Sequence, residues 1–460
     1  MSLISGSNTE LKTANLKKYI FLLTFIIAVF AASYSYANVQ PTFSGSYELR
    51  YINFKHADVL NPNINGDIGY FDLRFTLISD FMINENTSGV VGLESGHTVF
   101  GIDADNTSDE AVPGTDSIDL KLKSAYVDFV LPNGVSNFKV GLQPVTIFDK
   151  LIANEDAWGI TYLVEADRTI QINFVKIAEN SVSDDYKNPD NPERASRFAS
   201  IFYENDIFTT DLYSLLLGLY SDNDANIDGI LYENRRATYY GLGYKWSKHG
   251  IDCELHILYD SGKKRYTDAL NNSVSKKSEG YFASLTLDRS FENFDLDFEF
   301  VLATGDDNPD DDTDRAFMSV DGLVNFYDRA YILSGYITKD DADEKDGIFD
   351  SSVYKLSNLV FVRLGSEIRF SDDIWLDLAA MYAINDKSVI SAAGKKASDI
   401  GGEVDATLTF DVFDTYRDTK KGLLLNFFSA YFVPGNTYDR VDGSPAEDIY
   451  ILGTGLEYTF

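Results

Sequence analysis

The sequence predicts an all-β fold, a transmembrane antiparallel β-barrel of about 18 strands (16 to 18), preceded by a cleaved signal peptide. Three features predict it: an N-terminal segment suited to export, apolar residues that recur at every second position, and connections that alternate between short and long. Helical spacing of apolar residues is sustained almost nowhere.

The first 37 residues have the layout of a secretory signal. Three lysines precede an apolar run at residues 19–32, and Ser35, Tyr36 and Ala37 supply the small residues at which a signal peptidase cleaves. The run is short for a membrane-spanning helix, although an N-terminal anchor helix is the alternative interpretation. The predicted domains are therefore a signal peptide at 1–37 and an outer-membrane β-barrel at 38–460.

The composition excludes several classes of protein. Acidic residues outnumber basic ones 72 to 39, a formal net charge of −33, whereas a nucleic-acid-binding surface needs an excess of bases. Cys253 is the single cysteine, so no intramolecular disulfide can form, and with four histidines the sequence lacks the Cys/His clusters of zinc sites. With 14% aromatic residues, the chain is predicted to be ordered.

Apolar residues recur at every second position in segments along the whole chain. Ile251, Cys253 and Leu255 alternate with polar neighbours, and the same pattern runs through 294–302 and 404–412. This is the pattern of a strand with one face in an apolar medium and the other in water. The 18 segments so marked are 43–54, 69–83, 88–99, 119–131, 136–148, 158–165, 169–178, 198–204, 209–220, 237–246, 251–260, 280–289, 294–304, 353–370, 374–384, 401–413, 422–433 and 449–460.

The connections between these segments alternate in length. Every second one is short and rich in turn formers, such as residues 132–135 and 247–250, whereas the others are longer, up to residues 305–352. Short periplasmic turns and long extracellular loops are typical of outer-membrane barrels, whose aromatic girdles would here include residues near strand ends such as Phe43, Tyr51 and Trp246. A soluble sandwich or lectin is the alternative, because alternation also marks any half-buried sheet.

The last strand carries a resemblance. Residues 450–460, ending in Phe460, resemble the closing strand of Gram-negative outer-membrane proteins. The resemblance implies that Phe460 is recognised by the barrel-assembly machinery. Lipid and lipopolysaccharide of the outer membrane are the other partners expected from this localisation.

A narrower resemblance is confined to the last third of the chain. The Ala-Thr-Gly-Asp-Asp-Asn-Pro-Asp-Asp-Asp run at 303–312, together with Gly365-Ser366-Glu367, Gly402-Glu403-Val404-Asp405 and residues 432–435, resembles the alginate-export porin family. Members of that family are 18-stranded, which implies the same strand number here. A pore for a polyuronate should be lined by arginines, and this sequence departs from that pattern by carrying many acids.

The polar faces of the predicted strands supply the candidate pore-lining residues. Bases lie mainly on early strands and acids on later ones, which suggests a water-filled pore with a transverse field that admits small hydrated solutes. The acidic excess predicts a modest preference for cations. The candidates are Glu48, Arg50, Asp72, Arg74, Lys121, Lys123, Lys139, Asp252, Glu254, Asp295, Asp297, Glu299, Arg363, Glu367, Arg369, Glu403 and Asp405.

Acidic residues are dense at the start of the longest predicted loop. Weak binding of Ca²⁺ or Mg²⁺ is expected at Asp306, Asp307, Asp310, Asp311 and Asp312, because these ions prefer carboxylate oxygens. The run lacks EF-hand spacing, so a solvated loop of repelling charges is the alternative, and no other cofactor is expected. The loop, residues 305–352, either folds into the lumen and narrows it or caps the barrel mouth.

The predicted function is an outer-membrane porin for passive diffusion of small hydrophilic solutes and ions. A specific polysaccharide or organic-anion channel of the alginate-export type is the alternative within transport. A hydrolase or an adhesin of the outer membrane is the alternative from another class. No catalytic motif occurs and the histidines, among them His97 and His256, are scattered, so the chain is predicted not to be an enzyme.

Overall fold

The computed structural model describes residues 41–55, 68–100, 120–148, 151–166, 168–177, 197–208, 211–222, 225–227, 230–267, 273–308, 311–318, 330–333, 357–413 and 416–460. The predicted signal peptide at 1–37 lies outside these residues, as does most of the predicted loop at 305–352. Within the described part, no helix has the length and apolar character needed to cross a membrane.

The described chain is almost entirely strand. The elements in chain order are β1 (Pro41–Lys55), β2 (Ile68–Asn84), β3 (Thr87–Phe100), β4 (Leu120–Val130), β5 (Ser136–Ile147), β6 (Ala153–Glu165), β7 (Arg168–Ile177), β8 (Arg197–Phe208), β9 (Asp211–Asp222), β10 (Ala225–Ile227), β11 (Ile230–Lys248), β12 (Ile251–Thr267), β13 (Ser273–Ser290), β14 (Phe294–Ala303), β15 (Thr313–Asp314), β16 (Leu359–Arg369), β17 (Ile374–Ile390), β18 (Lys396–Asp411), α3 (Tyr416–Thr419), β19 (Gly422–Pro434), η3 (Asn436–Tyr438) and β20 (Ile449–Thr459).

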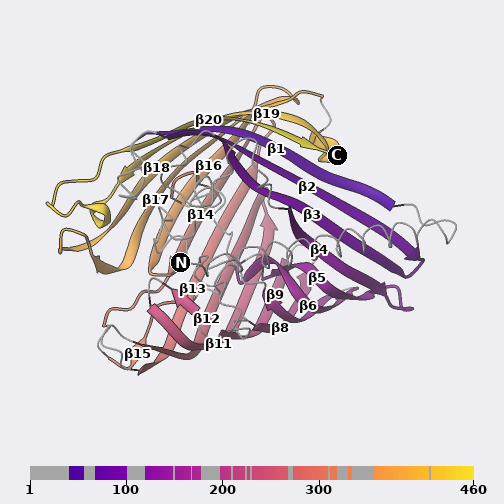
Figure 1. The fold of residues 1–460 in the computed structure, drawn as a ribbon, viewed down its shortest axis with the longest axis horizontal. Coiled ribbons are helices and arrows are strands. Elements are labelled where there is room, and N and C mark those ends of the chain that lie inside the picture. Colours follow the sequence, from indigo (N-terminus) through magenta and orange to yellow (C-terminus); the bar gives the residue numbers. More distant parts are fainter. Residues whose placement is uncertain are drawn as a thin grey trace, which may run out of the picture.

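These strands close into a barrel (Figure 1). Apart from the short β10 and β15, each strand pairs antiparallel with the next one along the chain, and β1 pairs with β20. At the seam, the Phe460 amide donates to the Gly45 carbonyl at 3.0 Å. Eighteen strands therefore form a closed antiparallel barrel, which confirms the predicted fold class and gives every long strand two neighbours.

Side chains alternate between the two faces of the barrel wall. On β9, Leu215, Leu217 and Leu219 are 43–54% exposed, whereas Leu216 and Tyr220 are buried. The same holds on β11, where Tyr240 and Leu242 lie exposed outside and Tyr239 is fully buried inside. An apolar outer face suits a lipid environment and would be unfavourable in water.

Several strands are longer than the alternation predicted. Strands β12, β13, β17 and β18 have 16 to 18 residues, and they occupy parts of the chain at 261–279 and 385–400 that were predicted to be loops. The alternation missed them because residues 263–265, Lys-Lys-Arg, place polar side chains on both faces of the strand. Backbone pairing with the neighbouring strand nevertheless continues through these residues. Alternation reports the apolar medium and not the strand itself.

An apolar core lies inside the barrel, toward the ends of the strands that the long loops connect. We call it the inner apolar belt, and its wall includes Ile52, Phe54, Tyr70, Val145, Ile147, Val175, Phe198, Tyr220, Tyr239, Leu258, Phe282, Val301, Phe361, Phe432 and Ile451. Three groups of loop residues enter it: Phe148 with Leu151 and Ile152, Phe317–Met318, and Ala330–Leu333. The sequence predicts that the polar faces of the strands line the pore, whereas at this level of the lumen the inward side chains are apolar.

Candidate pore lumen

Charged side chains of β1 to β6 form a network on the inner face, which we call the ion-pair wall. Arg50 of β1 pairs with Asp72 of β2, whose side chain is 2% exposed. The two residues are direct partners in the antiparallel register, so the sheet itself places the guanidinium beside the carboxylate. A buried carboxylate needs such a partner, because leaving it alone in the protein interior is costly.

The network continues from β2 across β3 and β4 to β6. The Glu94 carboxylate on β3 accepts from Arg74 at 3.1 Å and from Lys123 at 2.8 Å. Lys123 on β4 also lies 3.8 Å from Asp156 on β6. The ion-pair wall therefore contains three bases and three acids, and its charges balance.

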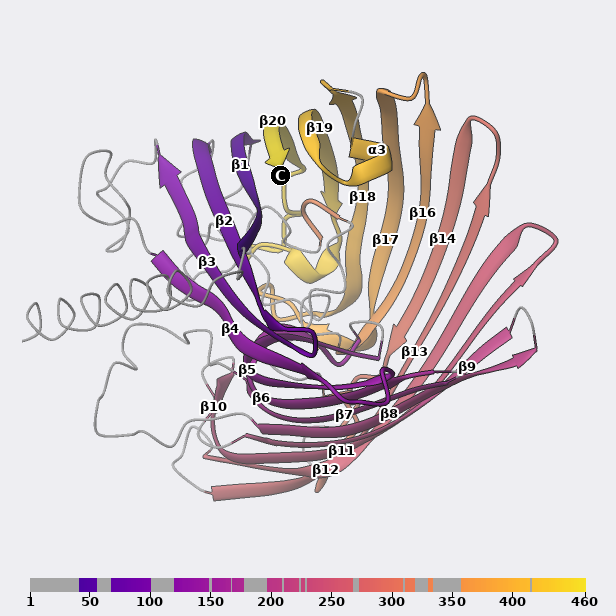
Figure 2. The ribbon, with the colours of Figure 1, turned by 90° about the vertical axis from the view of Figure 1, so that its right-hand side faces the viewer.

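A second group of inward charges lies on β14 to β18, on the other side of the barrel (Figure 2). We call it the acidic wall: Asp295, Asp297, Glu299, Glu367, Asp377, Glu403 and Asp405, with Arg363 and Arg369. Arg363 pairs with Asp297, and Arg369 pairs with Asp295 and with Glu367 at 2.8 Å. Two arginines face seven carboxylates, so this wall carries an excess of negative charge.

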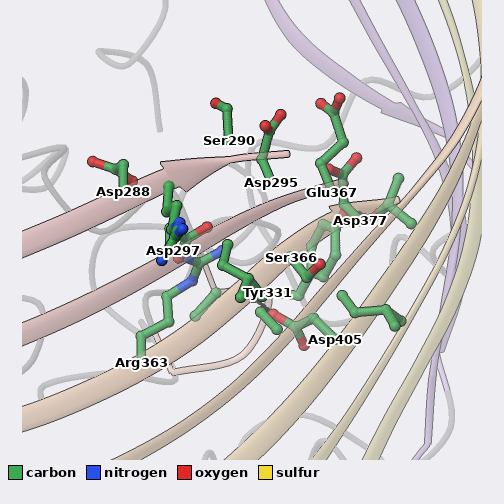
Figure 3. Close-up of a pocket in the computed structure, with 16 residues that line it drawn as sticks. Asp288, Ser290, Asp295, Asp297, Tyr331, Arg363, Ser366, Glu367, Asp377 and Asp405 are labelled. Carbon is green, nitrogen blue, oxygen red and sulfur yellow. Dashed lines mark hydrogen bonds and ion pairs between the residues drawn. The ribbon is translucent and has the colours of Figure 1, made fainter. Parts of the chain in front are cut away.

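A cavity of about 470 Å³ opens against the acidic wall (Figure 3). Its lining includes Arg289 and Arg363 together with six carboxylates, those of Asp288, Asp295, Asp297, Glu367, Asp377 and Asp405. Ala330 and Tyr331 of the inserted segment form part of the lining. A volume of this size holds a small solute with its hydration water, and the lining charges favour a cation.

The segment Ala330–Leu333 is held against the acidic wall by its backbone. The amides of Ile332 and Leu333 donate to the two oxygens of Glu403 at 2.7 and 2.6 Å, and the Tyr331 amide donates to Asp405 at 3.2 Å. Tyr331 also stacks on Phe428, with ring centroids 5.1 Å apart. Three successive amides thus bind two wall carboxylates, which fixes a loop segment inside the barrel.

The segment Phe317–Met318 is held on a different part of the wall. The Met318 amide donates to Asp260 on β12 at 3.1 Å, and the Tyr239 hydroxyl donates to the Met318 carbonyl at 2.7 Å. A Cβ atom on Gly280 would lie 2.4 Å from the Phe317 backbone, so only glycine permits this approach. The two inserted segments therefore contact separate stretches of the wall, on β11 to β13 and on β18 and β19.

The connection between β5 and β6 supplies the third inserted segment. Phe148 adopts a positive φ of 52°. The centroid of its ring lies 6.2 Å from that of Phe202 on β8 and 5.0 Å from that of His256 on β12. Leu151 and Ile152 are 1% exposed. Burial of these apolar side chains offsets the unfavourable backbone conformation of Phe148.

The remaining predicted pore-lining residues are dispersed around the lumen. Lys139 lies 5.9 Å from the Tyr126 ring, and Glu254 pairs with Lys245 at 2.9 Å. Glu48 lies between Arg74 and Glu457 in the register, Lys121 lies opposite Glu94, and Asp252 lies opposite Asp288. They belong to the inner face without converging on one point.

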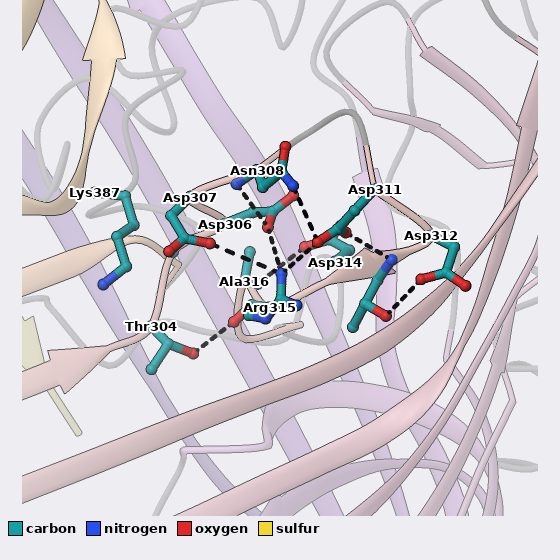
Figure 4. A network of polar contacts seen from close by, with 12 residues as sticks. Thr304, Asp306, Asp307, Asn308, Asp311, Asp312, Asp314, Arg315, Ala316 and Lys387 are labelled. Carbon is teal, nitrogen blue, oxygen red and sulfur yellow. Dashed lines mark hydrogen bonds and ion pairs between the residues drawn. The ribbon is translucent and has the colours of Figure 1, made fainter.

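The predicted acidic loop is organised around an arginine (Figure 4). Arg315 lies 2.9 Å from Asp311, 3.8 Å from Asp307 and 3.9 Å from Asp306. Asp310 lies outside the described residues, and Asp312 accepts from the Thr313 hydroxyl at 3.2 Å. Among the residues that the structure describes, no group of three His, Cys, Asp or Glu side chains could hold a metal ion, and divalent binding stays a prediction.

Several functional residues were missed from the sequence. Glu94 and Asp377 are ordinary inward acids that the alternation could have identified. Asp156 lies outside the segment predicted at 158–165 and has the parity of the exposed Trp158 and Ile160, so the alternation does not identify it. The inner apolar belt also had a signal: adjacent apolar residues such as Tyr51-Ile52, Tyr281-Phe282 and Tyr431-Phe432 interrupt the alternation near one end of their strands. Such pairs place an apolar side chain on each face.

The chain is similar to solved outer-membrane channels in fold. No protein-family model and no curated protein matches it. OccK8 (OprE) of Pseudomonas aeruginosa superposes with a TM-score of 0.55 at 12% identity, covering 92% of this chain and 98% of that one. OccAB4 of Acinetobacter baumannii gives 0.55 at 12% identity over 92% and 99%. OpdK of P. aeruginosa with vanillate gives 0.54 at 10% over 91% and 98%.

At these identities the likeness concerns the fold alone. It supports a barrel of porin type, and the narrower resemblance to the alginate-export family stays a prediction.

Proposed function

We propose that this chain is an outer-membrane porin through which small hydrophilic solutes and ions diffuse passively. One observation carries the proposal: the closed 18-stranded barrel has apolar side chains on its outer face and a balanced and an acidic charged wall inside. Hydrophobic matching to lipid outside and hydrated charge inside are the requirements of a membrane pore. The similar P. aeruginosa OpdK is itself described as an outer membrane protein.

The inserted segments narrow the pore at the inner apolar belt. A solute that enters from the loop side passes the buried side chains of Phe148, Phe317 and Leu333 before it reaches the cavity at the acidic wall. An apolar constriction disfavours water and ions, so the rate of passage depends on how these segments are seated. The proposed pore therefore has a restricted conductance.

Selectivity for cations follows from the acidic wall. Its excess of carboxylates raises the local concentration of cations, while the ion-pair wall contributes no net charge. The test is a pair of electrical measurements on the purified chain in planar bilayers. We expect discrete conductance steps and, in a salt gradient, a reversal potential of the sign for cations; a preference for anions would contradict the proposed selectivity, and absence of steps would contradict the pore.

A specific organic-anion or polysaccharide channel of the alginate-export type is the second candidate. It is favoured by the likeness to OpdK, which has been solved with vanillate, a carboxylate. Against it, Arg50, Arg74 and Lys123 are all paired with acids of the wall. Swelling of proteoliposomes separates the two candidates, because uptake of vanillate or uronate oligomers ahead of neutral sugars of equal size would favour the anion channel.

A hydrolase is the candidate from another class that the structure lets one examine. His256 Nε2 lies 3.3 Å from the Glu254 carboxylate, and His256 Nδ1 lies 3.5 Å from the Ser284 hydroxyl. The histidine therefore lies between a serine and an acid, as in a hydrolase triad. Ser284 is 2% exposed and its hydroxyl is buried in the wall, so a carbonyl substrate cannot reach it. We expect no esterase or lipase activity from the chain. Activity in the wild type that is lost in Ser284→Ala would support the hydrolase instead.

An adhesin is the remaining alternative. The barrel geometry does not require it, and deletion of the chain should leave surface attachment unchanged.

Recognition of Phe460 by the assembly machinery is part of the same proposal and is tested by the yield of folded barrel after Phe460→Ala.

A further inference from the structure

The outer surface of β11, β12 and β13 carries two ordered rows of side chains. The first is aromatic: Tyr240, Tyr259 and Tyr281 are direct neighbours in the register of the three strands. Their ring centroids lie 6.1 and 4.9 Å apart, and Tyr240 and Tyr281 are 51% and 56% exposed. Exposed tyrosines side by side on adjacent strands mark the level at which the hydrocarbon of a membrane meets its headgroups.

The second row is basic. Arg236, Lys263 and Lys277 are again direct neighbours in the register, and all three are exposed. Each lies four residues beyond its tyrosine, a distance of about 13 Å along the strand at 3.3 Å per residue. The tilt of barrel strands reduces the height above the tyrosines to about 10 Å. The row therefore lies at the level of the headgroups, within reach of long side chains.

The outward bases are less neutralised than those on the inner face of the same strands. Inside, Lys264 pairs with Asp314 of β15 at 2.6 Å and is 9% exposed. Outside, Lys277 pairs with Glu279 at 3.0 Å, while neither Arg236 nor Lys263 has an ion-pair partner among the residues that the structure describes. In a chain of net charge −33, this is a local surface of opposite sign.

We propose that Arg236, Lys263 and Lys277 bind the phosphate groups of an anionic lipid of the outer leaflet, such as the bisphosphorylated lipid A of lipopolysaccharide. Arginine and lysine suit phosphate oxygens, and the tyrosine row below them receives the start of the acyl chains. The proposal rests on the proposed function in one respect, that the outer face of the barrel contacts lipid. The proposal concerns the outer surface of the barrel and does not depend on the residues that line the lumen.

The test compares two variants of the folded full-length chain in detergent micelles. The first carries Arg236→Gln, Lys263→Gln and Lys277→Gln. The control carries Lys248→Gln, Lys420→Gln and Lys421→Gln, which remove the same charge from exposed sites at the opposite rim. Resistance of the barrel to denaturing gel electrophoresis without heating shows that each variant has folded.

Lipid A is the probe, and its retention is measured by native mass spectrometry at low salt. We expect the wild type and the control to retain lipid A ahead of phosphatidylcholine, and the first variant to bind it more weakly by on the order of a hundredfold. Raised ionic strength should weaken the wild type toward the variant.

Three results would overturn the proposal: equal binding by the first variant and the wild type, equal loss in the control, or displacement of lipid A by millimolar inorganic phosphate alone. Conductance of the same preparations is recorded separately. Loss of the lipid effect with conductance intact removes this inference only, and absence of conductance with lipid binding intact removes the proposed function only.

Discussion

The two charged walls of the lumen use similar residues to different effect. In the ion-pair wall, bases and acids alternate between neighbouring strands, so every charge meets its opposite and the wall is neutral. In the acidic wall, two arginines serve seven carboxylates, and Glu403 and Asp405 bind loop amides instead of bases. One wall is thus suited to holding strands together, and the other to holding a loop and attracting cations.

The largest effect is expected when the acidic wall loses its hold on the loop. The double variant Glu403→Gln with Asp405→Asn removes charged acceptors from the amides of residues 331–333 and should free that segment from the lumen. Single-channel conductance should rise severalfold, as should that of a chain lacking residues 317–336, much of which lies outside the described residues. Glu447→Gln, in an exposed loop pair, is the control, and unchanged conductance in the double variant would show that the segment does not limit flow.

A smaller effect is expected on ion selectivity. Neutralising the cavity carboxylates with Asp295→Asn, Asp297→Asn and Glu367→Gln leaves Arg363 and Arg369 without these ion-pair partners and reduces the acidic wall from seven carboxylates to four. The reversal potential in a salt gradient should move toward anion preference, with conductance of the same order. The matched control neutralises Asp372, Asp373 and Glu447, which are not part of the cavity lining, and an equal shift in the control would assign selectivity to the whole surface charge.

Substitutions in the ion-pair wall should lower the stability of the barrel and leave its ion selectivity almost unchanged. Arg50→Met leaves the buried Asp72 without the guanidinium that faces it, and we expect the free energy of unfolding in urea to fall by about 3 kcal/mol. The double variant Arg50→Met with Asp72→Leu should recover most of this loss, because it removes the buried charge as well. A fall of the same size in both variants would indicate lost packing instead of an unpaired charge.

The smallest effect is expected at the exposed loop pair of Arg315 and Asp311. The Arg315 hydrogen bond, and then the Thr313 amide, hold the pKa of Asp311 below its usual range. A carboxylate with a lowered pKa favours the folded loop above its unfolded pKa, and this contribution is lost as the pH falls through the folded value. Arg315→Gln should return the Asp311 titration, followed by carboxyl NMR, toward its ordinary pKa without a measurable change in the unfolding midpoint.

Arg440→Gln, which breaks another exposed pair, is the control for that titration and should leave Asp311 unchanged. A shifted unfolding midpoint in Arg315→Gln would show that the exposed loop pair contributes to stability as the buried pairs of the ion-pair wall do. The distinction between exposed and buried ion pairs would then be weakened.

Much of the fold could be predicted from particular segments of the sequence. Residues 294–302 and 404–412 alternate without interruption, and both became strands with their apolar side chains outside. The prediction failed at 261–267, 273–279, 385–390 and 396–400, where the strands carry polar residues on both faces, and at Phe282 and Phe361, where the inner face is apolar. Period two needs a contrast between the faces, and these stretches have none.

The sequence by itself predicted the barrel class, about 18 strands and, within the alternating segments, which charges lie on the polar face, because alternation depends only on neighbouring residues in the chain. The tertiary structure alone decided which charges meet, that Asp72 faces Arg50 while Glu403 faces the amides of Ile332 and Leu333. It also decided that three loop segments enter the lumen. Such contacts join residues far apart in sequence, and only the closed register of the strands brings them within a few ångströms of each other.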